Sequence, residues 1–213
     1  MAPGARPRRR GQRPADRRPA GGRRDHRAPH QRRGEASALS SLGGAHAALD
    51  DTQPAISFYE RQLAVTRELG DRRGEGNALS GLGSMYVLRG ELDEAVALCE
   101  RALRVFRALG DRSGEAEALG ILGNAHAGLG DPLLSIEHHD RQMAIACEIG
   151  DREVEAASSW NMGIVYEALG NIPRAAGAMR NYVEYLRSIG HTDLQRHEAR
   201  LNRLRARLGR SAR

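Results

Sequence analysis

Residues 109–124 read LGDRSGEAEALGILGN, and residues 69–84, 40 positions earlier, read LGDRRGEGNALSGLGS. Residues 149–164 hold a third copy, IGDREVEAASSWNMGI. One glycine and one glutamate recur at the same 40-residue spacing beyond these stretches. They are Gly43, Gly83, Gly123 and Gly163, and Glu35, Glu75, Glu115 and Glu155. A fixed period of about 20 to 50 residues is the signature of a protein built from stacked repeats. Such stacks serve as binding surfaces far more often than as catalysts.

Each period predicts a pair of helices, because its apolar positions recur at helical spacing. The glycine of each Leu/Ile-Gly phrase accepts the left-handed conformation that closes a helix, and the aspartate that follows three of these glycines is placed to cap the next helix. We expect the first helices of the pairs at residues 34–49, 74–89, 114–129 and 153–169. The second helices are expected at residues 53–69, 92–109, 132–149 and 172–189.

The glycines of the 43, 83, 123, 163 series fall in the middle of the first helices. A glycine there costs about 1 kcal/mol of helix stability relative to alanine. All four repeats have this unfavourable glycine at the same position of the 40-residue period. We therefore infer a packing reason: a neighbouring helix comes too close there for a side chain.

The sequence therefore predicts an all-α solenoid of antiparallel helix pairs over residues 31–190, with repeats at 31–70, 71–110, 111–150 and 151–190. Residues 191–213 are expected to form a basic capping helix and tail, because an imperfect apolar stripe runs through them among arginines and glutamate. Residues 1–30 are rich in Arg, Pro and Gly and contain no Leu, Ile, Val, Phe, Tyr or Trp. Such a segment is expected to be disordered.

Charge is segregated along the chain. Residues 1–33 hold 12 arginines against two acids, residues 34–190 hold 14 against 23, and residues 191–213 hold seven against two. Three interpretations of the first segment stay open: a basic arm for nucleic acid or an anionic surface, a tail without a role, or a start-site artefact ahead of a truncated array. The acidic body argues against broad contact with nucleic acid.

Other classes of site find little support in the sequence. Adjacent side chains on a helix point in different directions, so His138-His139-Asp140 is not expected to form a metal site. Neither Cys99 nor Cys147 has the partners of a nucleophile. We expect no catalytic residues, no metal and no cofactor. No apolar run approaches the roughly 20 residues that span a bilayer, so a cytoplasmic protein without membrane contact is expected.

The repeats resemble the tetratricopeptide repeat family. Its short motif places Leu-Gly in the first helix, an aromatic residue three positions later and Ala twelve positions after the Gly. The Leu-Gly pairs are Leu42-Gly43, Leu82-Gly83, Leu122-Gly123 and Met162-Gly163, the aromatic positions are His46, Tyr86, His126 and Tyr166, and the Ala positions are Ala55, Ala95, Ser135 and Ala175. The ordinary period is about 34 residues, so the 40-residue form looks like bacterial arrays and Pins-type adaptor scaffolds.

The resemblance implies a right-handed superhelix whose first helices line a concave groove that binds a peptide segment of a partner. Carried over by phase, the groove positions are Asn77, Ser80, Ser84, Glu117, Asn124, Trp160, Asn161, Ile164 and Glu167. Trp160 is the strongest single anchor candidate, because interface hot spots favour tryptophan. Its alternative role is packing against the last helices.

A non-enzymatic scaffold for a protein or peptide partner is thus the leading hypothesis. Two alternatives stay open. In one, the chain is a fragment of a larger bacterial signalling or regulatory protein, and the uncapped first repeat offers a route to self-association. In the other, the Arg-rich ends bind nucleic acid or an anionic surface.

Overall fold

The computed structural model describes residues 29–211, and within them all regular structure is helical. Most of the segment expected to be disordered (residues 1–30) or to bind nucleic acid (residues 1–33) lies outside the described residues. Residues 29–33 are described, and they are helical, which corrects the expected disorder for residues 29 and 30. The helices are α1 (Pro29–Ala48), α2 (Thr52–Leu69), α3 (Arg72–Arg89), α4 (Leu92–Leu109), α5 (Arg112–Leu129), α6 (Pro132–Ile149), α7 (Arg152–Ala168), α8 (Ile172–Ile189) and α9 (Leu194–Ser211).

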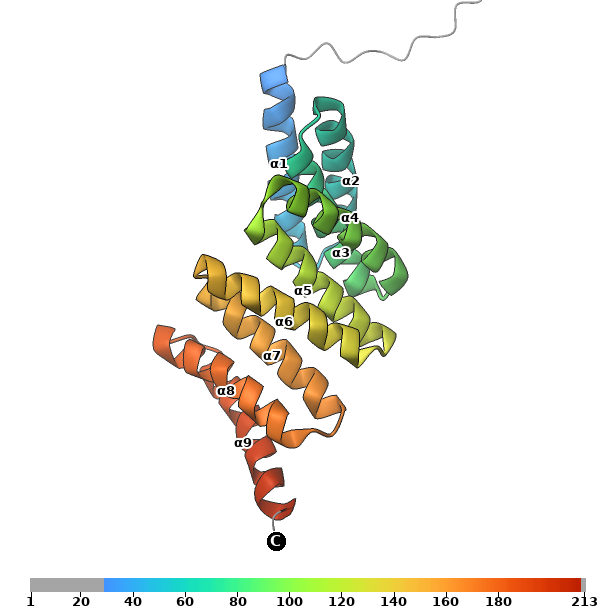
Figure 1. The fold of residues 1–213 in the computed structure, drawn as a ribbon. Coiled ribbons are helices and arrows are strands. Elements are labelled where there is room, and N and C mark those ends of the chain that lie inside the picture. The colour runs from blue at the N-terminus through green and yellow to red at the C-terminus, as the bar shows by residue number, and fades with distance from the viewer. Residues whose placement is uncertain (1–28, 212–213) are drawn as a thin grey trace, which may run out of the picture.

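The helices pack as sequential antiparallel pairs, α1 with α2 through α7 with α8, and α9 follows against α8 (Figure 1). The first helices of the pairs also touch one another in order, α1 with α3, α3 with α5 and α5 with α7. The predicted all-α solenoid is confirmed. One side of the stack is thus made from α1, α3, α5 and α7.

The helices end and begin at the expected glycine and aspartate residues. Gly70, Gly110, Gly150 and Gly190 each close a second helix with a positive φ of 66° to 74°. The side chains of Asp71, Asp111 and Asp151 accept hydrogen bonds from backbone N–H groups three residues later, at 2.9 to 3.1 Å. These bonds satisfy N–H groups that have no partner inside the helix.

The first helix begins at Pro29, five residues before the expected start at residue 34. Proline fits the first turn of a helix, where its missing N–H costs nothing. Arg32 lies in this added turn and pairs with Glu35 at 3.3 Å and with Glu68 of α2. These contacts hold the added turn against the second helix.

Each central glycine lies against a side chain from the second helix of its own pair. A Cβ on Gly83 would lie 2.2 Å from Sγ of Cys99, and one on Gly123 would lie 2.6 Å from Nε2 of His139. Gly43 and Gly163 meet Tyr59 and Met179 in the same way, at 2.7 and 2.5 Å. The residue facing the glycine always has the same phase, 59, 99, 139 or 179. The inferred packing reason is therefore correct.

The core runs through the whole stack as a thin layer of small and medium side chains. Phe106 is fully buried and fills the space between α3 and α5, where Gly76 and Gly114 leave room for its ring. At the C-terminal end, Leu201 and Leu204 of α9 pack on the last pair beside Met179. Helix α9 thereby covers apolar surface of α8 that would otherwise face water.

Candidate partner-binding groove

Two hollows open among the helices on the side of the stack formed by the first helices. The central hollow, of about 390 Å³, lies between α5, α6 and α7. Its lining residues are Ser113, Ala116, Glu117, Gly120, Ile121, Asn124, Gln142, Ile149, Asp151, Val154 and Asn161. Three of the expected groove residues, Glu117, Asn124 and Asn161, therefore meet at one place.

The N-terminal hollow, of about 240 Å³, lies between α1, α2 and α3. Its lining residues are Arg33, Ala36, Ser37, Ser40, Gln62, Thr66, Asp71, Arg73, Gly74 and Asn77. Asn77 is the expected groove residue here, and it is exposed. Ser84, farther along α3, is half-buried.

Ser80 departs from the expected groove. It is fully buried, and its Oγ has no hydrogen-bond partner within the described residues. Helix α3 packs against four helices, α1, α2, α4 and α5. Asn77 remains exposed on this helix, whereas Ser80 is enclosed by the packing.

Glu117 carries an unbalanced negative charge in the central hollow. Among residues 29–211, no side chain hydrogen-bonds to its carboxylate and no arginine pairs with it. The residue is exposed, yet the walls of the hollow keep part of the surrounding water away from its carboxyl group. This partial desolvation raises the pKa of Glu117, and the nearby Asp111 carboxylate raises it further. The field of Glu117 also reaches Tyr59 and Cys99, whose pKa values are raised by burial first and by this charge second.

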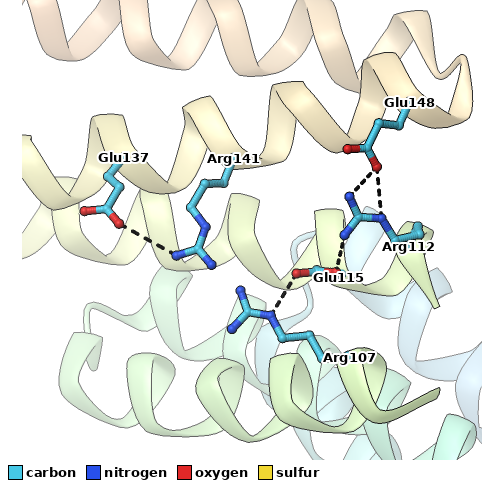
Figure 2. Close-up of polar contacts among 6 residues, drawn as sticks. All are labelled: Arg107, Arg112, Glu115, Glu137, Arg141 and Glu148. Carbon is cyan, nitrogen blue, oxygen red and sulfur yellow. Dashed lines mark hydrogen bonds and ion pairs between the residues drawn. The ribbon is translucent and has the colours of Figure 1, made fainter. Parts of the chain in front are cut away.

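Glu115, two residues earlier on the same helix, is by contrast paired with arginines (Figure 2). Arg107 of α4 donates from Nε to Glu115 at 2.8 Å, and Arg112 donates from Nη1 at 2.7 Å. Arg112 also binds Glu148 of α6, at 3.1 Å from Nε. Burial acts to raise the pKa of Glu115, but the two arginines outweigh it, so that the pKa is lowered.

The C-terminal end of this side is occupied by side chains of α9. Trp160 is half-buried, and its ring packs against His197 at 4.4 Å and Tyr182 at 5.3 Å between centroids. Arg200 lies 5.7 Å from the centre of the same ring. Its Nε and Nη2 also bind Oε2 of Glu167, at 3.1 and 2.9 Å. Trp160 thus has the surroundings of its alternative role, packing against the last helices.

Ile164, between these two residues on α7, remains 37% exposed. The phase argument missed Gln142, Ile149 and Val154, which belong to α6 and α7 and line the central hollow. One signal was available for Gln142. It has the same repeat phase as Gln62, and both are polar residues at a position on the second helix that faces the first helices.

Metal centres and membrane spans are two further features that a helical chain can carry. Within residues 29–211, no three His, Cys, Asp or Glu side chains gather closely enough to hold a metal ion. In the same range, none of the helices has the length and apolar character needed to cross a bilayer.

The tetratricopeptide repeat family model matches residues 34–108 and again residues 75–133. The apo form of RapI has a similar structure, with a TM-score of 0.68 and 18% identity over 83% of this chain and 49% of RapI. BtubC (BKLC) from P. vanneervenii gives a TM-score of 0.59 and 16% identity over 85% of this chain and 88% of BtubC. No curated protein matches the chain in sequence.

At such identities the likeness concerns the fold alone, and the chain spans about half the length of RapI. The agreement between the sequence match and the helix-pair architecture nevertheless leads to one conclusion. Residues 34–133 match the tetratricopeptide repeat family model and lie within a tetratricopeptide-like solenoid.

Proposed function

We propose that this protein is a non-enzymatic interaction scaffold, and that the groove along α1, α3, α5 and α7 binds an extended segment of a partner protein. The observation that carries the proposal is the central hollow, in which Glu117, Asn124 and Asn161 come together and stay accessible. Tetratricopeptide repeats are typically non-catalytic and generally bind proteins.

The amide side chains are suited to an extended peptide. Each asparagine offers both a donor and an acceptor, which matches the N–H and C=O groups of a peptide backbone. Asn77, Asn124 and Asn161 make no side-chain hydrogen bonds to other described residues, so their amides are available to a ligand. An exposed amide adds little to the stability of the fold, and the proposed role explains why amides recur along this side.

The proposed groove ends before α9. Trp160 and Glu167 hold α9 through His197 and Arg200, so we assign them to supporting this end of the groove. Ile164 is exposed beside them and forms the last apolar contact point available to a ligand. The partner segment would therefore extend from Asn77 across Asn124 and Asn161 toward Ile164.

The test is a selection of extended peptides from a displayed random library on the full chain, followed by fluorescence anisotropy with the selected peptides. Alanine at Asn124 and Asn161 together should weaken binding about fivefold or more, because a net hydrogen bond is worth about 0.5 to 1.5 kcal/mol. The matched control changes Glu100 and Arg104 of α4 to alanine, a pair that is exposed on the second helix of its repeat.

Both double variants should keep the helicity of the parent chain by circular dichroism. Equal affinity of the parent chain and the folded Asn124, Asn161 variant would remove the groove assignment. A comparable loss in the Glu100, Arg104 control would place the binding surface on the other side of the stack.

A further inference from the structure

We infer that the central hollow is a subsite for a basic side chain, Arg or Lys, of the bound partner segment. This inference rests on the proposed function and adds the chemistry of the ligand. It assigns Glu117 as the residue that determines this specificity.

The charge of the hollow points to a cation. Two carboxylates, those of Glu117 and Asp151, lie in its lining, and no Arg, Lys or His is among the lining residues. Asp151 uses one oxygen to accept the Val154 N–H at 3.0 Å, whereas Glu117 has no hydrogen-bond or ion-pair partner within the described chain. A cation that reached Glu117 would form a charge-assisted hydrogen bond in a partly desolvated place, where such bonds are strongest.

Glu117 differs in this respect from Asp111 and Glu115, the two acids that precede it in the sequence. The chain is rich in arginine, and neighbouring acids are paired: Asp111 with Arg73 at 2.7 Å, and Glu115 with both Arg107 and Arg112. The raised pKa of Glu117 agrees with this picture, since no internal cation stabilises its charged form. Asp111 and Glu115 are thus paired with arginines, whereas Glu117, inside the hollow, has no cationic partner within the described residues.

The rest of the lining suits the long stem of an arginine or lysine. Ile121, Ile149 and Val154 supply apolar surface beside the carboxylate, and basic side chains bury their methylene groups against such surface while the charged end stays polar. Gly120 leaves room for the side chain of Gln142, another lining residue, because a Cβ there would lie 2.3 Å from its Nε2. Asn124 and Asn161 border the hollow and remain available for the peptide backbone.

The two hollows differ in charge, and only the central one favours a cation. The basic residue of the partner segment is therefore expected where the segment crosses the central hollow. The N-terminal hollow has Arg33 and Arg73 in its lining beside Asp71, so a second cation gains nothing there. One basic residue near the centre of the bound segment is therefore the expected pattern.

The experiment repeats the selection from a displayed random peptide library on the full chain, on Glu117→Gln and on Glu137→Gln. Both variants remove one negative charge, but Glu137 lies on α6 outside the hollow and pairs with Arg141 at 3.7 Å (Figure 2). The parent chain and Glu137→Gln should enrich Arg or Lys at one position, and Glu117→Gln should not. The best selected peptide should bind Glu117→Gln about fivefold or more weakly, as expected for loss of a charge-assisted hydrogen bond.

Charge reversal gives a second readout. Selection on Glu117→Arg should replace the basic residue by Asp or Glu at the same position of the peptide. Circular dichroism establishes whether each variant is folded. If Glu117→Arg does not fold, the comparison of the isosteric variants Glu117→Gln and Glu137→Gln still tests the inference. Enriched peptides without a basic position, or equal affinity for the parent chain and Glu117→Gln, would overturn the inference and leave the groove function standing.

If no peptide is enriched over a surface without protein, the groove function fails, and the inference with it. A last arm changes the arginines of residues 1–28 to glutamine in the full chain. Tighter peptide binding by that chain would identify its own arginine-rich segment as the occupant of the hollow, and would overturn the assignment to a partner. Unchanged binding supports the partner.

Discussion

The indole of Trp160 and the imidazole of His197 meet edge to face, with their centroids 4.4 Å apart and their planes at 80°. This contact joins α7, a repeat helix, to α9, which lies outside the repeats. It explains why the tryptophan is half-buried, and it gives a direct test of what holds the last helix in place.

Replacing Trp160 by alanine should loosen α9. Truncating a buried tryptophan costs about 3 to 5 kcal/mol, so a half-buried one should cost about 2 kcal/mol. We expect a lower melting temperature and faster hydrogen exchange over residues 194–211 than over the central helices. Exchange in α9 that stays as slow as in the parent chain would show that its other contacts, those of Leu201, Leu204 and Arg200, hold the helix without the tryptophan.

Replacing Gly83 by alanine should destabilise the chain, because the new Cβ would lie 2.2 Å from Sγ of Cys99. Overpacking of this kind costs about 1 to 3 kcal/mol. Gly177 provides the matched control, because it is an exposed glycine in α8 and no atom lies within 4 Å of the position that a Cβ would occupy there. Alanine at Gly177 should therefore stabilise the chain by about 0.5 to 1 kcal/mol. Chemical denaturation measures both changes.

The double variant Gly83→Ala, Cys99→Ala refines this test. Removing the thiol relieves the clash, so the two changes together should cost less than the sum of their separate effects. Strictly additive losses would show that the glycine is required for another reason.

Replacing Asp50 by glycine should stabilise the first turn between helices. Asp50 is the only non-glycine residue with a positive φ in the described chain, at 59°, and the equivalent turns use Gly90, Gly130 and Gly170. Relief of the left-handed strain should outweigh the entropy cost of glycine, for a gain of about 0.5 kcal/mol. Thermal unfolding of Asp50→Gly beside Asp50→Ala checks this, and alanine should be the less stable of the two.

Replacing Glu115 by glutamine should destabilise the chain at neutral pH by about 1 to 3 kcal/mol, because Arg107 and Arg112 lose a buried charged partner. The folded-state pKa of Glu115 is lowered, so its contribution is present above the unfolded value and is lost as the pH falls through the folded value. The difference between parent and variant should therefore shrink at acidic pH. Glu137→Gln, at an exposed pair, should change stability little at any pH.

The two thiols should differ sharply in reactivity. Cys99 is fully buried, and burial together with the charge of Glu117 raises its pKa to about 12, whereas Cys147 is exposed. The thiolate is the reactive form, so alkylation of the native chain should label Cys147 and spare Cys99. Mass spectrometry after a short exposure to iodoacetamide provides the measurement, with denaturant-unfolded chain as the control in which both thiols react.

The features that repeat along the chain could be predicted from the amino-acid order alone. The 40-residue period, the Gly-Asp phrases and the central glycines predicted the helix pairs, their caps and their closest contacts, because each depends on local backbone geometry or on a neighbour at a constant phase. The family resemblance, carried over by repeat phase, implied that Glu117, Asn124 and Asn161 lie on one side of the stack, and the structure brings them to one hollow.

The features that could not be predicted depend on packing between helices. They occur where the repeat pattern ends, or where neighbouring helices cover a residue. Helix α9 has no counterpart in the period, so phase could not say that His197 and Arg200 would take up Trp160 and Glu167. Ser80 is buried in the packing of α3 against four neighbouring helices, which no single helix encodes. The pairing of arginines likewise depends on distances between helices, and it is these distances that leave Glu117 without a cation.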